Sequence, residues 1–208
     1  MDENSVGKSH PLSDSPELGT TILDAALQML RSKGPSGILP VEGTSMMPFL
    51  RPGMRVLIDF APRQLRRGDV VLFRQGPHAV VHRMVARTSD GVRARGDNRA
   101  NLDPPVRVDD VLGRVVSVGD GDDWRDLRRS GARTYGFLLA LHNLAWSGAS
   151  VVASWIDKRL ARIGIRNAAF RIVRGLDALN MRLAHRLLFR LVHRRVPPPD
   201  SSATSPKS

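Results

Sequence analysis

Short runs of apolar residues alternate with Gly- and Pro-containing turns between residues 38 and 118. Turn sequences such as RPG, RRG, QGP and SDG separate the runs. The runs that have the length and the β-branched content of strands are residues 38–41, 55–59, 70–74, 79–87, 91–95 and 111–118. Short strands at this spacing predict a mainly β domain, a folded sheet or small barrel of about 90 residues.

A polar segment precedes this domain. Residues 1–19 are rich in Ser, Pro and acidic residues, a composition typical of a flexible leader. A short helix is expected next, because Thr21 and Asp24 have the spacing of a capping box and Gly34 suits the helix end. The apolar positions that would share one face of this helix are Ile22, Ala26, Met29 and Leu30.

The pattern becomes helical after Trp124. Residues 134–156 carry no formal charge and are long enough to cross a bilayer, although their polar side chains make that costly. Farther on, Arg and Leu each recur at every fourth position and predict two neighbouring stripes of an amphipathic helix. The stripes are Arg182, Arg186, Arg190 and Arg194 beside Leu179, Leu183, Leu187 and Leu191.

These patterns divide the chain into four parts. They are a leader at 1–19, a domain at 20–123 that holds the short helix and the predicted strands, a helical basic region at 124–196 and a disordered tail at 197–208. The expected fold class is therefore mainly β, with a short N-terminal helix and a C-terminal α-helical extension.

Composition narrows the function classes. The chain has no Cys, which excludes disulfides, a thiol nucleophile and thiolate zinc sites. Its first residues are polar and acidic, so neither a secretory signal nor an N-terminal anchor is expected. The formal net charge of +12 falls entirely within residues 124–196, which hold 15 basic and 3 acidic side chains. The β domain is therefore neutral, and the extension carries the charge.

The candidate chemistry lies in the β domain. Ser45 stands in the turn sequence Gly-Thr-Ser-Met-Met-Pro, where its hydroxyl and backbone N–H should be accessible, as a nucleophile and an oxyanion donor require. His82 follows an apolar strand pattern that predicts partial burial, and Asp97 and Asp103 lie in turns. Each residue taken alone is also typical of turn chemistry, a cap or a hydrogen-bonded core histidine.

The order of these motifs carries more information than any one of them. They run Gly43-x-Ser45-Met46-x-Pro48, Arg67-Gly68-Asp69-Val70-Val71, His82-Arg83, Gly96-Asp97-Asn98, Asp103 and Gly113-Arg114-Val115. This order resembles the signal peptidase I superfamily of serine proteases, which includes the LexA-type self-cleaving repressors, over residues 38–118.

The base distinguishes branches of this superfamily. Bacterial signal peptidases and LexA-type repressors use a Lys, but the four lysines here, Lys8, Lys33, Lys158 and Lys207, all lie outside the stretch from Ser45 to the end of the β domain. At the equivalent place stands His82, followed by Arg83, which is similar to the archaeal, endoplasmic-reticulum and sporulation-type signal peptidases.

The resemblance implies roles for individual residues. Ser45 would be the nucleophile, His82 the general base and Asp103 the carboxylate that orients the imidazole, with Asp97 as the second candidate for that carboxylate. The oxyanion would be bound by the Ser45 N–H with help from Thr44, because Gly43 replaces a Ser found in many relatives. Neither a cofactor nor a metal is expected.

The function expected from this resemblance is a serine endopeptidase, similar to signal peptidase I, that cleaves a leader or signal segment from a peptide or protein precursor. One alternative is a LexA-like autoproteolytic regulator, although the chain lacks both a catalytic Lys and room for a helix-turn-helix before Ser45. The other is a catalytically silent, membrane-associated adaptor of the same fold.

The basic extension predicts a partner. An amphipathic helix with Arg beside Leu favours contact of residues 134–195 with an anionic membrane surface. Packing on the β domain or self-association is the next alternative, and nucleic acid is the least favoured because no recognised binding motif accompanies the Arg residues. We expect a membrane-associated protein on the cytoplasmic side, with residues 134–156 as an alternative transmembrane segment.

Overall fold

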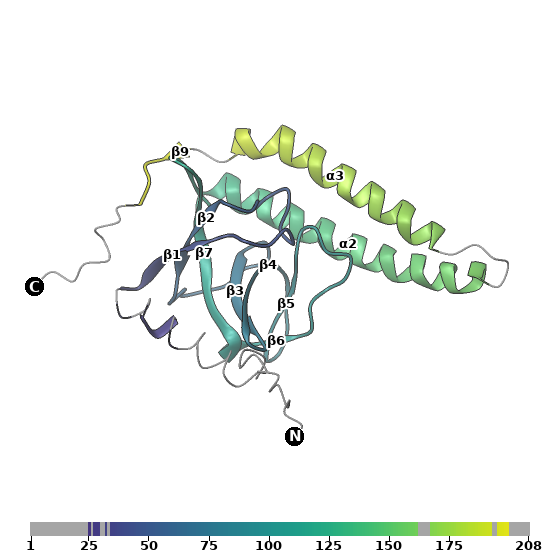
Figure 1. Ribbon diagram of the computed structural model, residues 1–208, viewed down its shortest axis with the longest axis horizontal. Coiled ribbons are helices and arrows are strands. Elements are labelled where there is room, and N and C mark those ends of the chain that lie inside the picture. The colour runs from purple at the N-terminus through teal and green to yellow at the C-terminus, as the bar shows by residue number, and fades with distance from the viewer. Residues whose placement is uncertain are drawn as a thin grey trace, which may run out of the picture.

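The computed structural model describes residues 25, 27–29, 32, 34–161, 167–192 and 195–199. A β domain lies beside two long antiparallel helices that protrude past it (Figure 1). Residues 25, 27–29 and 32 are helical. The predicted fold class is therefore confirmed. The leader at 1–19, the capping pair Thr21 and Asp24, and residues 200–208 of the tail lie outside the described residues.

The strands of the described residues form one antiparallel sheet in the order β1-β2-β7-β3-β4-β5-β6, with β8 paired to β7 and β9. The strands are β1 (Ser36–Pro40), β2 (Arg55–Asp59), β3 (Val70–Gln75), β4 (His78–Arg87), β5 (Gly91–Arg95), β6 (Val106–Arg107), β7 (Val111–Asp120), β8 (Asp123–Asp126) and β9 (Arg195–Val196). A 3₁₀ turn, η1 (Val108–Asp110), precedes β7. The β3–β4 register places His82 opposite Val71.

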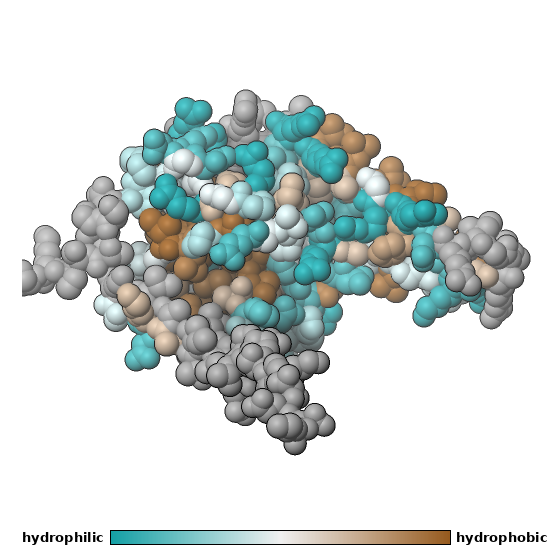
Figure 2. Space-filling model, in the orientation of Figure 1, coloured by the Kyte–Doolittle hydropathy of each residue, from teal (hydrophilic) through white to brown (hydrophobic). Residues whose placement is uncertain are grey.

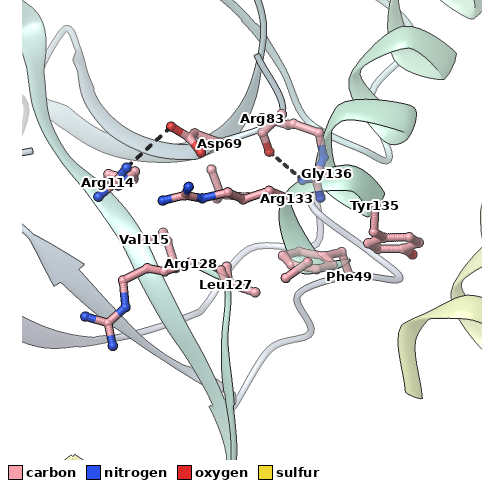
Figure 3. A pocket seen from close by; sticks show the side chains of 13 residues that line it. Phe49, Asp69, Arg83, Arg114, Val115, Leu127, Arg128, Arg133, Tyr135 and Gly136 are labelled. Atoms are coloured by element: carbon pink, nitrogen blue, oxygen red, sulfur yellow. Dashed lines mark hydrogen bonds and ion pairs between the residues drawn. The ribbon is translucent and has the colours of Figure 1, made fainter. Parts of the chain in front are cut away.

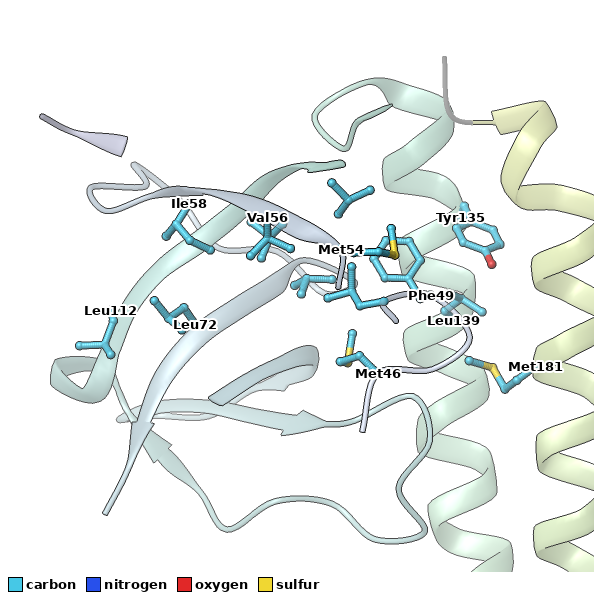
Figure 4. Packing of buried hydrophobic residues seen from close by; sticks show 14 of the residues in the cluster. Met46, Phe49, Met54, Val56, Ile58, Leu72, Leu112, Tyr135, Leu139 and Met181 are labelled. Carbon is cyan, nitrogen blue, oxygen red and sulfur yellow. The ribbon is translucent and has the colours of Figure 1, made fainter. Parts of the chain in front are cut away.

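Strand β3 is buried on both faces, because the sheet folds over it. Its alternate residues enter two different cores: Val70 and Leu72 join the larger one, Val71 and Phe73 the smaller. The larger core continues from the sheet to Tyr135 and the two helices (Figure 4). A strand covered on both sides has a continuous apolar sequence, which is why VVLF does not alternate.

The sheet extends beyond the predicted boundary at residue 123, because β8 pairs with β7 through Asp126. Trp124 of β8 is 1% exposed, and its ring occupies the space where a Cβ on Gly119 would be. Strands β6, β8 and β9 are two to four residues long and carry charged residues, so the sequence has no apolar run that would predict them. Their extended conformation is set by backbone hydrogen bonds to the neighbouring strands.

Helices α2 (Ser130–Leu160) and α3 (Ala168–Val192) pack against each other as an antiparallel hairpin. The start of α2 contacts the sheet at Gly136, where the Gly68 backbone lies so close that a Cβ on Gly68 would collide with the helix. At the other end, the Asp157 carboxylate accepts hydrogen bonds from the Ala169 and Phe170 N–H groups of α3. A carboxylate at a helix N-terminus also interacts favourably with the helix dipole.

The apolar stripe predicted on α3 does not face the β domain. Leu179 and Leu183 are 53% and 47% exposed, whereas Asp177 and Met181 are each 3% exposed on the inward face. Arg182, next to Leu183, is exposed as well. The side chains of residues 187–194 lie outside the described residues, so the observed stripe is its first half.

Candidate active site

Ser45 lies in the loop between β1 and β2, partly exposed. The residues after it anchor the loop: Met46, Phe49 and Leu50 are at most 2% exposed and belong to the larger core. The Met47 N–H donates to the Thr44 carbonyl, which closes a tight turn around Ser45. Because the turn residues are small and polar and the residues that follow are buried in the core, Ser45 is held at the edge of the core.

Three side chains from separate segments meet at this turn. His82, on β4 and 2% exposed, lies with its Nε2 at 2.9 Å from Ser45 Oγ and its Nδ1 at 2.7 Å from Asp103 Oδ2. An ionised carboxylate only accepts, so Nδ1 carries the proton and Nε2 accepts from the Ser45 hydroxyl. This arrangement can move a proton from the hydroxyl to the imidazole and stabilise the resulting imidazolium.

Asp97, the other carboxylate proposed for this position, points elsewhere. Both of its oxygens bond the buried Arg83 guanidinium, at 2.9 and 2.7 Å, and one also accepts from Asn143 Nδ2 of α2 at 2.7 Å. Asp97 therefore holds the segment after β5 against α2, while Asp103 reaches His82. A backbone bond from the Asp103 N–H to the Ala94 carbonyl brings the chain back to that point.

The position of Ser45 beside His82 depends on a turn formed by residues 96–99, which we call the 96–99 turn. The Asn98 N–H donates to the Ser45 carbonyl at 2.7 Å, and Asn98 Nδ2 donates to the Thr44 carbonyl at 3.2 Å. Gly96 in this turn packs directly on the Ser–His pair, because a Cβ there would lie 2.6 Å from Ser45 O and 2.9 Å from His82 Nε2.

Replacing Gly96 with alanine is expected to separate the serine from the imidazole and to slow the reaction of Ser45 with a serine-directed fluorophosphonate roughly 100-fold, because small displacements of reacting groups are costly. Labelling rates measure the effect. The control is Gly148→Ala, since a Cβ on Gly148 meets nothing within 4 Å. An unchanged labelling rate in Gly96→Ala would contradict the packing argument.

Of the groups expected to bind the oxyanion, the described part of the chain presents the Ser45 N–H but no clear second donor. Among the described residues, none accepts a hydrogen bond from the Ser45 N–H, so this donor is available to a ligand. Thr44 is exposed, and its carbonyl is taken up by Met47 and Asn98. At Gly43 a Cβ would meet nothing within 4 Å, so the position leaves open space beside the turn.

Charged residues that the sequence patterns did not single out join this site to the hairpin. Arg95, fully buried on β5, donates to the Asn143 carbonyl of α2 and, at 2.6 Å, to Asp177 of α3. Arg95 also donates to the Arg99 carbonyl at 2.7 Å. The one available sequence signal was Asp177 itself, one of three acids in the basic region.

The Asp177 carboxylate is ionised in this network. Burial acts to raise its pKa, but hydrogen bonds and ion pairs with His142 and Arg95 outweigh that effect and leave the pKa below its ordinary value. Next to it, Arg174 of α3 donates to the Asn98 carbonyl at 3.1 Å. Helix α3 therefore contacts the 96–99 turn at Asn98, the residue that bonds the Ser45 and Thr44 carbonyls.

Gly68 and Asp69 of the Arg67-Gly68-Asp69 motif line a cavity of about 20 Å³ between the sheet and α2, and no residue of the triad lines it (Figure 3). Asp69 accepts the Arg66 N–H at 2.8 Å and pairs with Arg114 at 3.8 Å. Burial raises the pKa of the Asp69 carboxyl, and these partners oppose the shift. The motif therefore shapes a turn where α2 meets the sheet. Within the described residues no cluster of three or more His, Asp or Glu side chains is arranged to hold a metal ion.

Fold and site together define a serine-type peptidase domain. A family model described as Peptidase S24-like matches residues 4–116, more than half of the chain. The protein belongs to the Peptidase S24-like family, which confirms the resemblance to the superfamily of LexA-type repressors and signal peptidases. No curated protein matches the chain.

Proposed function

We propose that this protein is a serine endopeptidase of the Ser–His branch that cleaves a leader or signal segment from a peptide or protein precursor. The observation that carries the proposal is the hydrogen-bonded chain from Ser45 through His82 to Asp103. Ser45 Oγ has an imidazole nitrogen as its neighbour, whereas Lys158, the one lysine among the described residues, lies in the last turn of α2.

The reaction follows from this geometry. Ser45 Oγ attacks the scissile carbonyl carbon while its proton passes to His82 Nε2, and the Ser45 N–H stabilises the negative oxygen that forms. When the carbon–nitrogen bond breaks, the imidazolium returns the proton to the leaving amine. Water then attacks the seryl ester with His82 as base, and Ser45 regains its proton as the ester bond breaks.

A precursor would bind in extended form along a strand edge beside Ser45. Strand β1 ends the strand order of the described sheet, and it leads directly into the Ser45 loop. An edge strand offers unpaired backbone groups that an extended peptide can bond, which is the usual way a sheet binds a segment of another chain. A leader segment presented without its own secondary structure meets this requirement.

The proposal is tested by labelling the purified protein with a serine-directed fluorophosphonate. The parent protein should be labelled, Ser45→Ala should not, and the control Ser89→Ala, at an exposed position on the β4–β5 turn, should be labelled like the parent. In cells, Ser45→Ala should cause an uncleaved precursor to accumulate. A folded parent protein that does not react would indicate a catalytically silent adaptor. A Ser45→Ala variant that still reacts would show that Ser45 is not the labelled nucleophile, and the proposal would be wrong.

Family membership favours a second candidate function, a LexA-like self-cleaving regulator. The two functions differ in what is cut. A self-cleaving chain should fragment with a rate constant independent of its concentration, and the fragments should be absent from Ser45→Ala. A processing endopeptidase should remain intact on incubation and should cleave an added precursor.

A further inference from the structure

Large apolar side chains gather on the outside of the helical hairpin. Of the fifteen exposed ones among the described residues, twelve lie on α2 and α3. They are Phe137, Leu138, Leu141, Leu144, Val151, Val152, Trp155, Ile156, Ile172, Leu176, Leu179 and Leu183. Apolar patches follow the outer edge of α3 and the protruding half of α2 (Figure 2). An exposed apolar surface of this kind marks a place of contact with a partner.

In the protruding half of α2, small residues are buried and large apolar residues are exposed. A helix surrounded by water usually buries its large apolar residues instead. Ser147, Ser150 and Ala153 are buried, at most 6% exposed, on the face that carries Asp157 and contacts α3. Val151 and Trp155, on the opposite face, are 67% and 56% exposed. Small residues between helices and large apolar residues outside are characteristic of helices that pack in lipid.

Positive charge accompanies this apolar surface. Arg171, Arg182 and Arg186 are exposed along α3 beside the leucines, and the region 124–196 carries all of the net charge of +12. At the end of α2, the Arg159 guanidinium stacks over the Trp155 ring at 4.4 Å. A Trp with a basic neighbour suits the boundary between acyl chains and headgroups, where an aromatic ring is half apolar and a guanidinium meets lipid phosphates.

We propose that the α2–α3 hairpin docks on an anionic lipid bilayer through its outward apolar face, with the flanking arginines on lipid phosphates. Charge complementarity favours lipid over a second copy of this chain, because two such hairpins would bring like charges together. The apolar stripe between the arginines favours lipid over nucleic acid. Lipid acyl chains can cover apolar side chains, whereas a nucleic acid binds basic residues mainly through its charged phosphates. The docking goes beyond the proposed peptidase function and does not depend on Ser45.

The hairpin is expected to lie along the bilayer rather than to cross it. Among the described residues, one helix, Ser130–Leu160, is long and apolar enough to span by length and composition. Its first half, however, is bound to the β domain: Asn143 bonds Arg95 and Asp97, and Tyr135 lies in the larger core. Crossing would leave those two buried charges without these partners, which is costly.

The test is flotation of the full-length protein with vesicles of phosphatidylcholine, alone or mixed with phosphatidylglycerol. Binding should require the anionic lipid and weaken as salt is added. The variant Leu176→Gln/Leu179→Gln should lose about tenfold or more in affinity, because two leucines no longer enter the bilayer. The variant Arg182→Gln/Arg186→Gln should lose roughly fivefold per arginine. Val108→Gln, at an apolar position 61% exposed on the sheet domain, is the control and should bind like the parent.

Circular dichroism shows whether each variant is folded, and the fluorophosphonate labelling rate should be unchanged in all of them, which separates docking from catalysis. Absence of binding by the folded parent would overturn the proposal, as would leucine variants that bind normally. A dimer that the leucine variants dissolve, without vesicle binding, would assign the surface to self-association. Binding to a nucleic acid without vesicle binding would also refute it. Resistance to alkaline extraction would replace flat docking by a membrane-crossing helix.

Discussion

Replacing His82 with alanine is expected to slow acylation of Ser45 by a fluorophosphonate, and cleavage of a precursor, by roughly three to four orders of magnitude. The reason is that Ser45 Oγ has one basic neighbour, the His82 Nε2 at 2.9 Å, and without it the hydroxyl keeps its proton. The rate of labelling measures this directly and needs no knowledge of the natural substrate.

The matched control is His78→Ala, since His78 is an exposed histidine on the same strand. It should label at the parent rate. Asp103→Asn should also slow the reaction strongly, because an amide can donate to Nδ1 and thereby leaves the proton on Nε2, where it blocks acceptance from Ser45. If His82→Ala retained the parent rate while folded, another base would have to activate Ser45, and the Ser–His assignment would be wrong.

Replacing Asp177 with alanine is expected to lower the free energy of unfolding by about 3 kcal/mol, because it leaves the fully buried Arg95 without its charged partner. Chemical denaturation measures the change. The control is Asp120→Ala, which removes an ion pair with Arg51 whose side chains are 58% and 56% exposed, and which should cost less than about 1 kcal/mol.

The dependence of this effect on pH has a definite sign. Since the folded pKa of Asp177 lies below its ordinary value, its contribution to stability is fully present at neutral pH and is lost as the pH falls through that lowered pKa. The difference between the parent protein and Asp177→Ala should therefore shrink in acid. A difference that stays constant through the acidic range, or a loss as small as that of Asp120→Ala, would contradict the role of the ion pair.

The sequence patterns predicted several elements with the bounds that the structure has. Strands β2 and β5 begin and end where expected, because Pro- and Gly-containing turns enclose their apolar runs. The buried ion pairs of Arg83 with Asp97 and of Arg95 with Asp177 were not predictable from such local patterns. The strand patterns made no prediction about the burial of Arg83 and Arg95, yet these side chains are 1% and 0% exposed, because carboxylates from other segments pair with them.

The amphipathic pattern of α3 shows the same limit. Spacing alone placed Leu179 and Leu183 on one stripe, but it left open whether that stripe faces the β domain or the surroundings. The choice is made by Asp177 and Met181, which bond and pack inward and so turn the leucines outward. A single inward carboxylate with a buried arginine as partner outweighs an apolar stripe, because an unpaired buried charge is the more costly alternative.

The amino-acid order alone determined the mainly β class, the serine in its turn, the histidine on its strand and the neutral and basic parts of the chain, because these depend on local periodicity and on residue types. The tertiary structure decided which carboxylate reaches His82, and it placed α3 against the 96–99 turn. Both are contacts between segments far apart in the chain: Asp103 lies 21 residues from His82, and Arg174 lies 76 residues from Asn98. Only closure of the sheet and docking of the hairpin bring such groups within hydrogen-bond distance.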